Sequence, residues 1–155
     1  MVQYCMQYQH VMRLVLDTDA MVAAIRSDAG ASRLLLQSVL ERRQGLTLLV
    51  SVPLLIEYEA VMTRAEHLKV ARLSVADIGT LLDAVAAAAE PVRLAYLWRP
   101  MLPDADDDMV LEAAVNGGAN GIVTFYRRDF DPSVKQFGIL ALSPGEAVRL
   151  LEKRP

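Results

Sequence analysis

Acidic residues crowd one short stretch of the chain, and this crowding is its clearest chemical signal. Four aspartates occupy five positions directly before an apolar run: Asp104, Asp106, Asp107 and Asp108. Carboxylates packed this closely repel one another, and a fold tolerates them when a cation neutralises their charge. Hard divalent cations such as Mg²⁺ prefer oxygen ligands, usually one or two carboxylates with water. The stretch therefore predicts an acidic pocket that binds a metal ion.

A second acidic group follows an apolar segment far upstream. Residues 14–16 are Leu-Val-Leu, and Asp17-Thr18-Asp19 comes directly after them. In open α/β sheets, ligands bind outside the carboxyl ends of the strands. Asp17 lies at such an end, and the aspartate cluster follows a third predicted strand, so both can face one crevice. Glu57 lies in a predicted helix among apolar neighbours and can point into the same pocket.

Each of these residues also has a structural explanation. An aspartate after a strand often caps the next helix, which would account for Asp17 alone, and Glu59 competes with Glu57 for a place in the pocket. One aspartate before Met109 is explained by the helix dipole, whereas four are not. A solvated acidic loop is the alternative reading of the cluster. An EF-hand is a poor match, because Met109 stands where its glycine should be and no glutamate closes the loop.

Composition narrows the class of protein. The chain has 155 residues, 54% of them apolar, which predicts one domain with a sizeable core. Its formal charge of -3 excludes a global basic field for nucleic acid. Cys5 is the only cysteine, which excludes an internal disulfide and a multi-cysteine zinc site and fits a cytoplasmic protein. The histidines, His10 and His67, form no metal motif, and we expect His67 at the surface of a helix end.

The first residues of the chain differ in character from the rest. The first ten residues are polar and lack the apolar core of a signal peptide. We expect a flexible leader over residues 1–11 and a single domain over residues 12–155. No apolar stretch reaches the length that spans a membrane.

Strand and helix patterns alternate, which predicts an α/β domain around a mostly parallel sheet flanked by helices. Strands are expected at residues 13–16, 46–50, 92–96, 121–124 and 138–142. Helices are expected at residues 20–26, 31–43, 51–64, 74–90 and 107–116, with a last helix opening at residue 143. Ser51, Ser74 and Ser143 have the sequence context of helix caps.

Taken together, these residues resemble the PIN-domain family, metal-dependent nucleases that include VapC-type toxins of toxin–antitoxin systems. The resemblance spans about residues 12–151 and rests on the order of several segments: 14–19, 54–62, 103–109, 118–124, 128–130 and the helix start at Ser143-Pro144. It implies a three-layer α/β fold with a mostly parallel central sheet between helices.

The resemblance also implies a site for Mg²⁺ or Mn²⁺. The resemblance assigns catalysis and metal binding to Asp17, Glu57 and Asp107. It adds Asp129 as a further metal ligand. Tyr58, directly after Glu57, favours Glu57 over Glu59. Four more residues would support the site: Asp19, Thr124, Asp106 and Asp108. Asp106 or Asp108 would take the place of Asp107 if the register of the resemblance shifts.

One position departs from the family pattern. Members often carry Asp or Asn two residues after the threonine that matches Thr124, and this chain carries Tyr126. A neutral phenol is a poor Mg²⁺ ligand. Either Asp129 substitutes for the missing acid, or the site binds metal with fewer carboxylates.

The function implied is that of an endoribonuclease that hydrolyses RNA phosphodiesters, the toxin of a toxin–antitoxin pair. Arg127 and Arg128 could contact phosphates or be solvated loop charges. Expected partners are RNA, an antitoxin on another chain, and a second copy of this chain, since the helices at residues 31–43 and 74–90 offer apolar surface.

Two rival functions stay open. Asp17-Thr18-Asp19 resembles the opening motif of haloacid dehalogenase-like phosphatases, which use an aspartate nucleophile, and Ser51 ends a strand as that family requires. Met21 stands against this reading, because that family carries Thr or Val there. The other rival is a catalytically weak RNA-binding PIN module, suggested by Tyr126.

Overall fold

The structure is a computed structural model that describes residues 11–95 and 105–153, with the backbone alone at residues 105–107 and 133. Within these residues, five parallel strands form the central sheet. The strands lie in the order β3-β2-β1-β4-β5. Their bounds are Met12–Leu16 (β1), Leu46–Val50 (β2), Glu90–Pro91 (β3), Gly121–Val123 (β4) and Leu140–Leu142 (β5). The expected parallel α/β sheet is confirmed, and the expected leader falls almost wholly outside the described residues.

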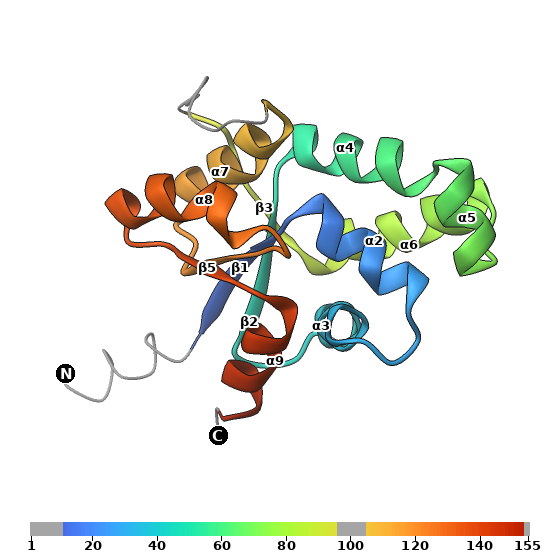
Figure 1. Ribbon diagram of the computed structural model, residues 1–155, viewed down its shortest axis with the longest axis horizontal. Coiled ribbons are helices and arrows are strands. Elements are labelled where there is room, and N and C mark those ends of the chain that lie inside the picture. The colour runs from blue at the N-terminus through green and yellow to red at the C-terminus, as the bar shows by residue number, and fades with distance from the viewer. Residues whose placement is uncertain (1–10, 96–104, 154–155) are drawn as a thin grey trace.

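Strand β1 lies at the centre and marks the point where the chain reverses direction across the sheet. It pairs with β2 on one side and with β4 on the other, through Leu14↔Leu48 and Val15↔Ile122. Since crossovers between parallel strands are right-handed, connections in opposite directions cover opposite faces of the sheet. Helices α2 (Thr18–Arg26) and α3 (Ala31–Leu40) accordingly lie on the other face from α7 (Ala105–Gly117) (Figure 1). Ligands bind such sheets at the carboxyl ends of the strands beside this reversal, here β1 and β4.

Five more α-helices within the described residues cover the sheet. Their bounds are Val52–Met62 (α4), Ala65–Ala71 (α5), Val75–Ala88 (α6), Arg127–Val134 (α8) and Pro144–Glu152 (α9). Three of them, α4, α6 and α9, begin with the expected serine caps. Ser51 caps α4 through its hydroxyl, and capping boxes open α6 and α9. A serine cap contributes about 1 kcal/mol to a helix. No helix within residues 11–95 and 105–153 is long and apolar enough to cross a membrane.

The core reflects the uninterrupted apolar runs of the strands. Val15, Leu49 and Ile122, neighbours across the three central strands, are completely buried. Parallel strands are covered by helices on both faces, so adjacent residues are apolar instead of alternating with polar ones. The three consecutive apolar residues before Asp17 are therefore what a central strand requires.

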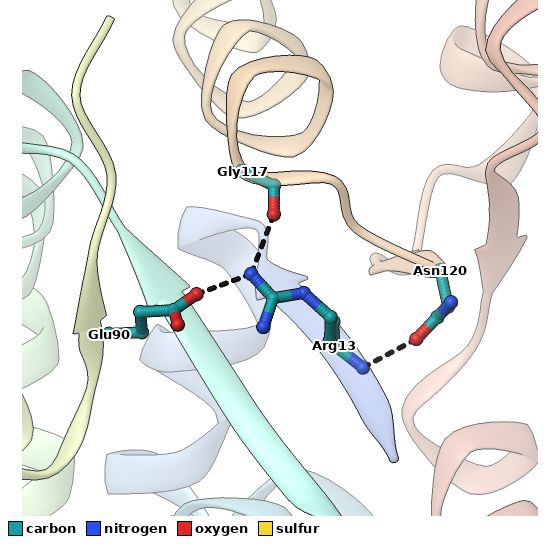
Figure 2. Close-up of polar contacts among 4 residues, drawn as sticks. All are labelled: Arg13, Glu90, Gly117 and Asn120. Carbon is teal, nitrogen blue, oxygen red and sulfur yellow. Dashed lines mark hydrogen bonds and ion pairs between the residues drawn. The ribbon is translucent and has the colours of Figure 1, made fainter. Parts of the chain in front are cut away.

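Arg13 fixes one end of α7 against the sheet. Its guanidinium donates to the carbonyl of Gly117 at 2.8 Å and pairs with Glu90 of β3, while its backbone N–H donates to Asn120 Oδ1 at 2.7 Å (Figure 2). A cation at a helix C-terminus also interacts favourably with the helix dipole. Because α7 ends beside the first residues of β1, its opening turn, with Asp106 in it, lies towards the carboxyl ends of the strands.

Four elements differ from the prediction. Strand β3 spans Glu90–Pro91, whereas residues 92–95 of the strand expected at 92–96 are not in a strand and residue 96 lies outside the described residues. Proline is tolerated there because one side of an edge strand needs no hydrogen bond. Helix α3 ends at Leu40 because Arg42 has a left-handed φ of 55°. Helices α5 and α8 were not predicted. Neither has a side-chain cap, because Arg64 and Tyr126 stand at their N-cap positions.

Candidate active site

A cleft of about 480 Å³ opens at the carboxyl ends of β1 and β4. Four carboxylate residues from three parts of the chain line it: Asp17, Asp19, Glu57 and Asp129. The remaining lining is mixed, with hydroxyl, apolar, basic and aromatic side chains: Thr18, Val22, Val61, Arg64, His67 and Tyr126. The sheet therefore brings together four of the residues predicted for the site, as the position of the chain reversal requires.

Asp17 is held rigidly between β1 and α2. Its side chain is almost buried, with 6% of the residue exposed. One carboxylate oxygen accepts the backbone N–H of Thr18 at 2.8 Å, and the other accepts the hydroxyl of Thr124 at 2.8 Å. The backbone N–H of Asp17 donates to Val123 O, which continues the β1–β4 ladder beyond the strand. Asp17 caps helix α2, as its structural explanation required, and it also faces the cleft.

Asp19 has a buried oxygen that no described residue satisfies. Its Oδ2 accepts the backbone N–H of Phe125 at 3.1 Å, whereas its Oδ1 is buried and has no hydrogen-bond donor among the described residues. Burial raises the pKa of Asp19, and its hydrogen-bonding neighbours, first the Phe125 N–H, oppose this shift only in part. A buried anionic oxygen without a donor is costly, and a bound cation would offset that cost. The four carboxylates of the cleft offer the oxygen ligands that Mg²⁺ or Mn²⁺ prefers, and so fit such an ion.

Tyr58 places helix α4 against the end of β1. Its side chain is completely buried, and its hydroxyl donates to Leu16 O, the carbonyl directly before Asp17. Burial, and secondly the negative charge of Asp17, raise the pKa of Tyr58 well above its ordinary range. This contact directs the preceding residue, Glu57, into the cleft, while Glu59 is exposed and does not line it.

Thr124 connects the two sides of the site. Its side chain is completely buried; it donates to Asp17 and accepts the backbone N–H of Tyr126 at 3.0 Å. Asp129 lies in the first turn of α8, exposed at the cleft wall. The threonine thus orders both the aspartate of β1 and the segment that leads to Asp129.

The aspartate cluster is only partly described. Asp104 lies outside the described residues, and Asp106 and Asp107 belong to α7 without described side chains. The predicted role of Asp107 stays a prediction. Asp108 is 1% exposed and does not line the cleft, so the reading of the cluster as a solvated loop is wrong for this residue. Among described residues, no three acidic, histidine or cysteine side chains converge closely enough to hold an ion by themselves.

Some residues of interest were not found from the sequence. Glu112 is completely buried one helical turn after Asp108. The sequence signal that could have identified it was a single acidic residue in an apolar run, four positions after Asp108 and therefore on the same face of the helix. His67 was expected at the surface, but its side chain is 12% exposed and lines the cleft. Its Nδ1 accepts from Arg26 at 3.1 Å, since a guanidinium can only donate. The missed helix α5 explains the error.

The arginines beyond β4 lie elsewhere than the cleft. Arg127 donates to Glu146 at 2.6 Å and so has its charge offset by α9. Neither Arg127 nor Arg128 lines the cleft. Arg64 is the guanidinium that does, from the N-cap of α5.

Comparison with known proteins agrees with this geometry. Residues 13–128 match the model of the PIN domain, and the chain belongs to that family. Its fold is similar to that of a chain in the crystal structure of VapBC2 from Rickettsia felis bound to a DNA fragment from their promoter. That match has a TM-score of 0.52 and 14% identity, and it covers 85% of this chain and 98% of the other. Comparison with curated protein sequences gives no significant match. The family assignment replaces the haloacid dehalogenase-like alternative.

Proposed function

We propose that this protein is a metal-dependent ribonuclease of the PIN type, the toxin of a toxin–antitoxin pair, acting in the cytoplasm. The observation that supports it most strongly is the buried Asp19 oxygen without a donor, next to Asp17 in a cleft with four carboxylates. A cation would satisfy this oxygen and reduce the repulsion between the cleft and an anionic backbone. Phosphodiester hydrolysis is the chemistry that such a pocket supports.

Asp17, Glu57 and Asp107 would hold Mg²⁺ or Mn²⁺, with Asp129 as a further ligand. When bound, the ion would activate water and neutralise charge on the phosphate. Thr124 keeps Asp17 in one orientation through the 2.8 Å hydrogen bond. Glu57, directed into the cleft by the neighbouring Tyr58, accepts a hydrogen bond from the attacking water in this proposal.

Basic groups in the same cleft would bind the substrate. Arg64 and His67 line the cleft, and Arg26 hydrogen-bonds to the ring of His67. A guanidinium forms strong, charge-assisted hydrogen bonds to phosphate. Arg64 thus takes the role that the sequence suggested for Arg127, which is paired with Glu146.

The test is cleavage of single-stranded RNA with Mn²⁺, with EDTA as the metal-free arm. Asp17→Asn and Asp107→Ala should each lower the rate by about 100-fold or more. Asp131→Asn is the matched control, since Asp131 lies on α8 with Asp129 but does not line the cleft. Cleavage that survives in EDTA or in Asp17→Asn would contradict the proposal. RNA binding without cleavage under any metal would favour the binding-module alternative.

The proposed assembly has two parts. An antitoxin partner is proposed because the fold is shared with a chain of the VapBC2 complex. A homodimer is proposed because apolar side chains stay exposed on both helices expected to form it, with Leu34 of α3 at 47% and Val75 of α6 at 61%. Light scattering of the isolated chain tests the dimer, and a mass near 17.1 kDa would contradict it.

A further inference from the structure

Two aromatic rings are exposed directly beside the acidic site. Phe125 is 54% exposed and Tyr126 is 63% exposed. Their backbones are tied to the site: the N–H of Phe125 donates to Asp19 at 3.1 Å, and that of Tyr126 donates to Thr124 at 3.0 Å. Thr124 in turn donates to Asp17, so both rings extend from backbone that is fixed relative to the carboxylates.

Only one of the two rings belongs to the cleft. Tyr126 lines it, together with the apolar side chains of Val22 and Val61, whereas Phe125 does not. Tyr126 occupies the N-cap position of α8, but its side chain makes no capping hydrogen bond. The ring is therefore presented to the cleft without a structural task in the helix start. A tyrosine offers a large, rigid contact surface with only two rotatable side-chain bonds.

We propose that Tyr126 stacks on an unpaired nucleobase of the RNA strand whose phosphate lies over the carboxylates. The inference rests on the proposed function and adds a contact to it: Tyr126 would hold the free base next to the cleaved bond. Duplex bases are already stacked on one another, whereas unpaired bases bind aromatic faces. Such stacking tolerates any base, because every base has a π-face. The ring adds contact area without adding negative charge that would repel the phosphates.

The experiment measures binding of a fluorescent single-stranded RNA by anisotropy in Mn²⁺. All proteins carry Asp17→Asn, which removes hydrolysis and is present equally in every protein that is compared. Adding Tyr126→Ala or Tyr126→Leu should raise Kd by about 5- to 150-fold, whereas Tyr126→Phe should keep the affinity. Phe125→Ala is the matched control and should change Kd less than twofold, because the Phe125 ring does not line the cleft. Thermal melting verifies that each variant is folded.

An abasic scan separates stacking from a structural role. RNAs with one base removed at successive positions should bind normally except at one position, where the loss matches that of Tyr126→Ala. In the Tyr126→Ala protein, that same abasic position should cost nothing further, as a double-mutant cycle requires. An equal loss at every position would indicate a structural effect and overturn the proposal.

Other outcomes distinguish this inference from the proposed function. If the wild-type protein cleaves RNA while Tyr126→Ala binds as tightly as its parent, stacking is wrong and the ribonuclease stands. If duplex RNA binds as tightly as single-stranded RNA, stacking is also wrong. If no RNA is bound by any variant or cleaved by the wild type, both fail, and the exposed ring belongs to a protein contact instead.

Discussion

Thr124 is the single side chain whose removal should loosen the site most. Thr124→Val keeps the shape of the side chain and deletes its hydroxyl. In the folded protein this hydroxyl is completely buried, donates to the Asp17 carboxylate and accepts from the Tyr126 backbone. The valine protein therefore loses one hydrogen bond to a buried charged group.

The size of the effect follows from the two hydrogen bonds. A bond to a charged group contributes about 1.5–3 kcal/mol to stability. The Tyr126 amide belongs to an exposed residue, where water can replace the lost acceptor, so it adds little. The free energy of unfolding should fall by about 1.5–3 kcal/mol. At about 2–4 °C per kcal/mol for a domain of this size, the melting midpoint should fall by about 3–12 °C.

The assay is urea and thermal unfolding in EDTA, since a bound metal would add its own stabilisation. Thr80→Val is the matched control: Thr80 is exposed on α6 and donates to the neutral carbonyl of Ala76 at 3.1 Å. That change should stay within about 0.5 kcal/mol of the wild type. If Thr124→Val costs no more than Thr80→Val, the hydroxyl does not hold Asp17, and the account of the site is wrong.

Three further predictions concern the groups around the cleft. The folded protein retains the Tyr58 proton above the ordinary pKa of 10.0, so stability should fall as pH rises past about 10. Tyr58→Phe should flatten this fall, as urea midpoints will show. Burial raises the pKa of Asp19, so folding favours the protonated carboxyl, and the stability of the metal-free protein should fall as pH rises from about 3.8. Asp19→Asn should remove this fall, raise the melting temperature in EDTA at neutral pH and lose part of the Mn²⁺ stabilisation. An unchanged melting temperature in EDTA would contradict the buried-charge argument. Saturating Mn²⁺, at about a hundred times its dissociation constant, should stabilise the wild type by about 2.7 kcal/mol and raise its melting temperature. In the same thermal-shift series, Glu57→Gln should reduce this rise, whereas Glu59→Gln, at an exposed residue, should keep it.

The sequence predicted the elements whose signals are local. The apolar run that ends in Asp17 identified the central strand and its carboxyl end, and the serines at three helix starts identified α4, α6 and α9. Glu57 was preferred over Glu59 through the resemblance, and the structure directs it into the cleft. These predictions succeeded because strand burial and helix capping depend on neighbours in the chain.

The features that were missed depend on tertiary packing. Helix α5 follows Arg64, whose side chain does not cap it, so no local signal predicted this helix. The positions of Arg64 and His67 at the cleft were missed for the same reason. Burial of Asp108 was missed because its surroundings come from packing of distant segments, whereas the apolar run around Glu112 was a local signal that was not used. The buried Asp19 oxygen is likewise visible only once β4 lies against β1.

The most direct test of the central claim is a crystal of the protein grown with Mn²⁺ and measured for the anomalous signal of that metal. We expect one strong peak in the cleft, from an ion bound to oxygens of Asp17 and Asp107. The ion should face the buried Asp19 Oδ1 and be reached by Glu57 directly or through water. Metal–oxygen distances should be about 2.0–2.2 Å. A crystal at saturating Mn²⁺ with no peak among these carboxylates, or with its only peak elsewhere on the surface, would contradict the claim that this cleft is a metal-dependent active site.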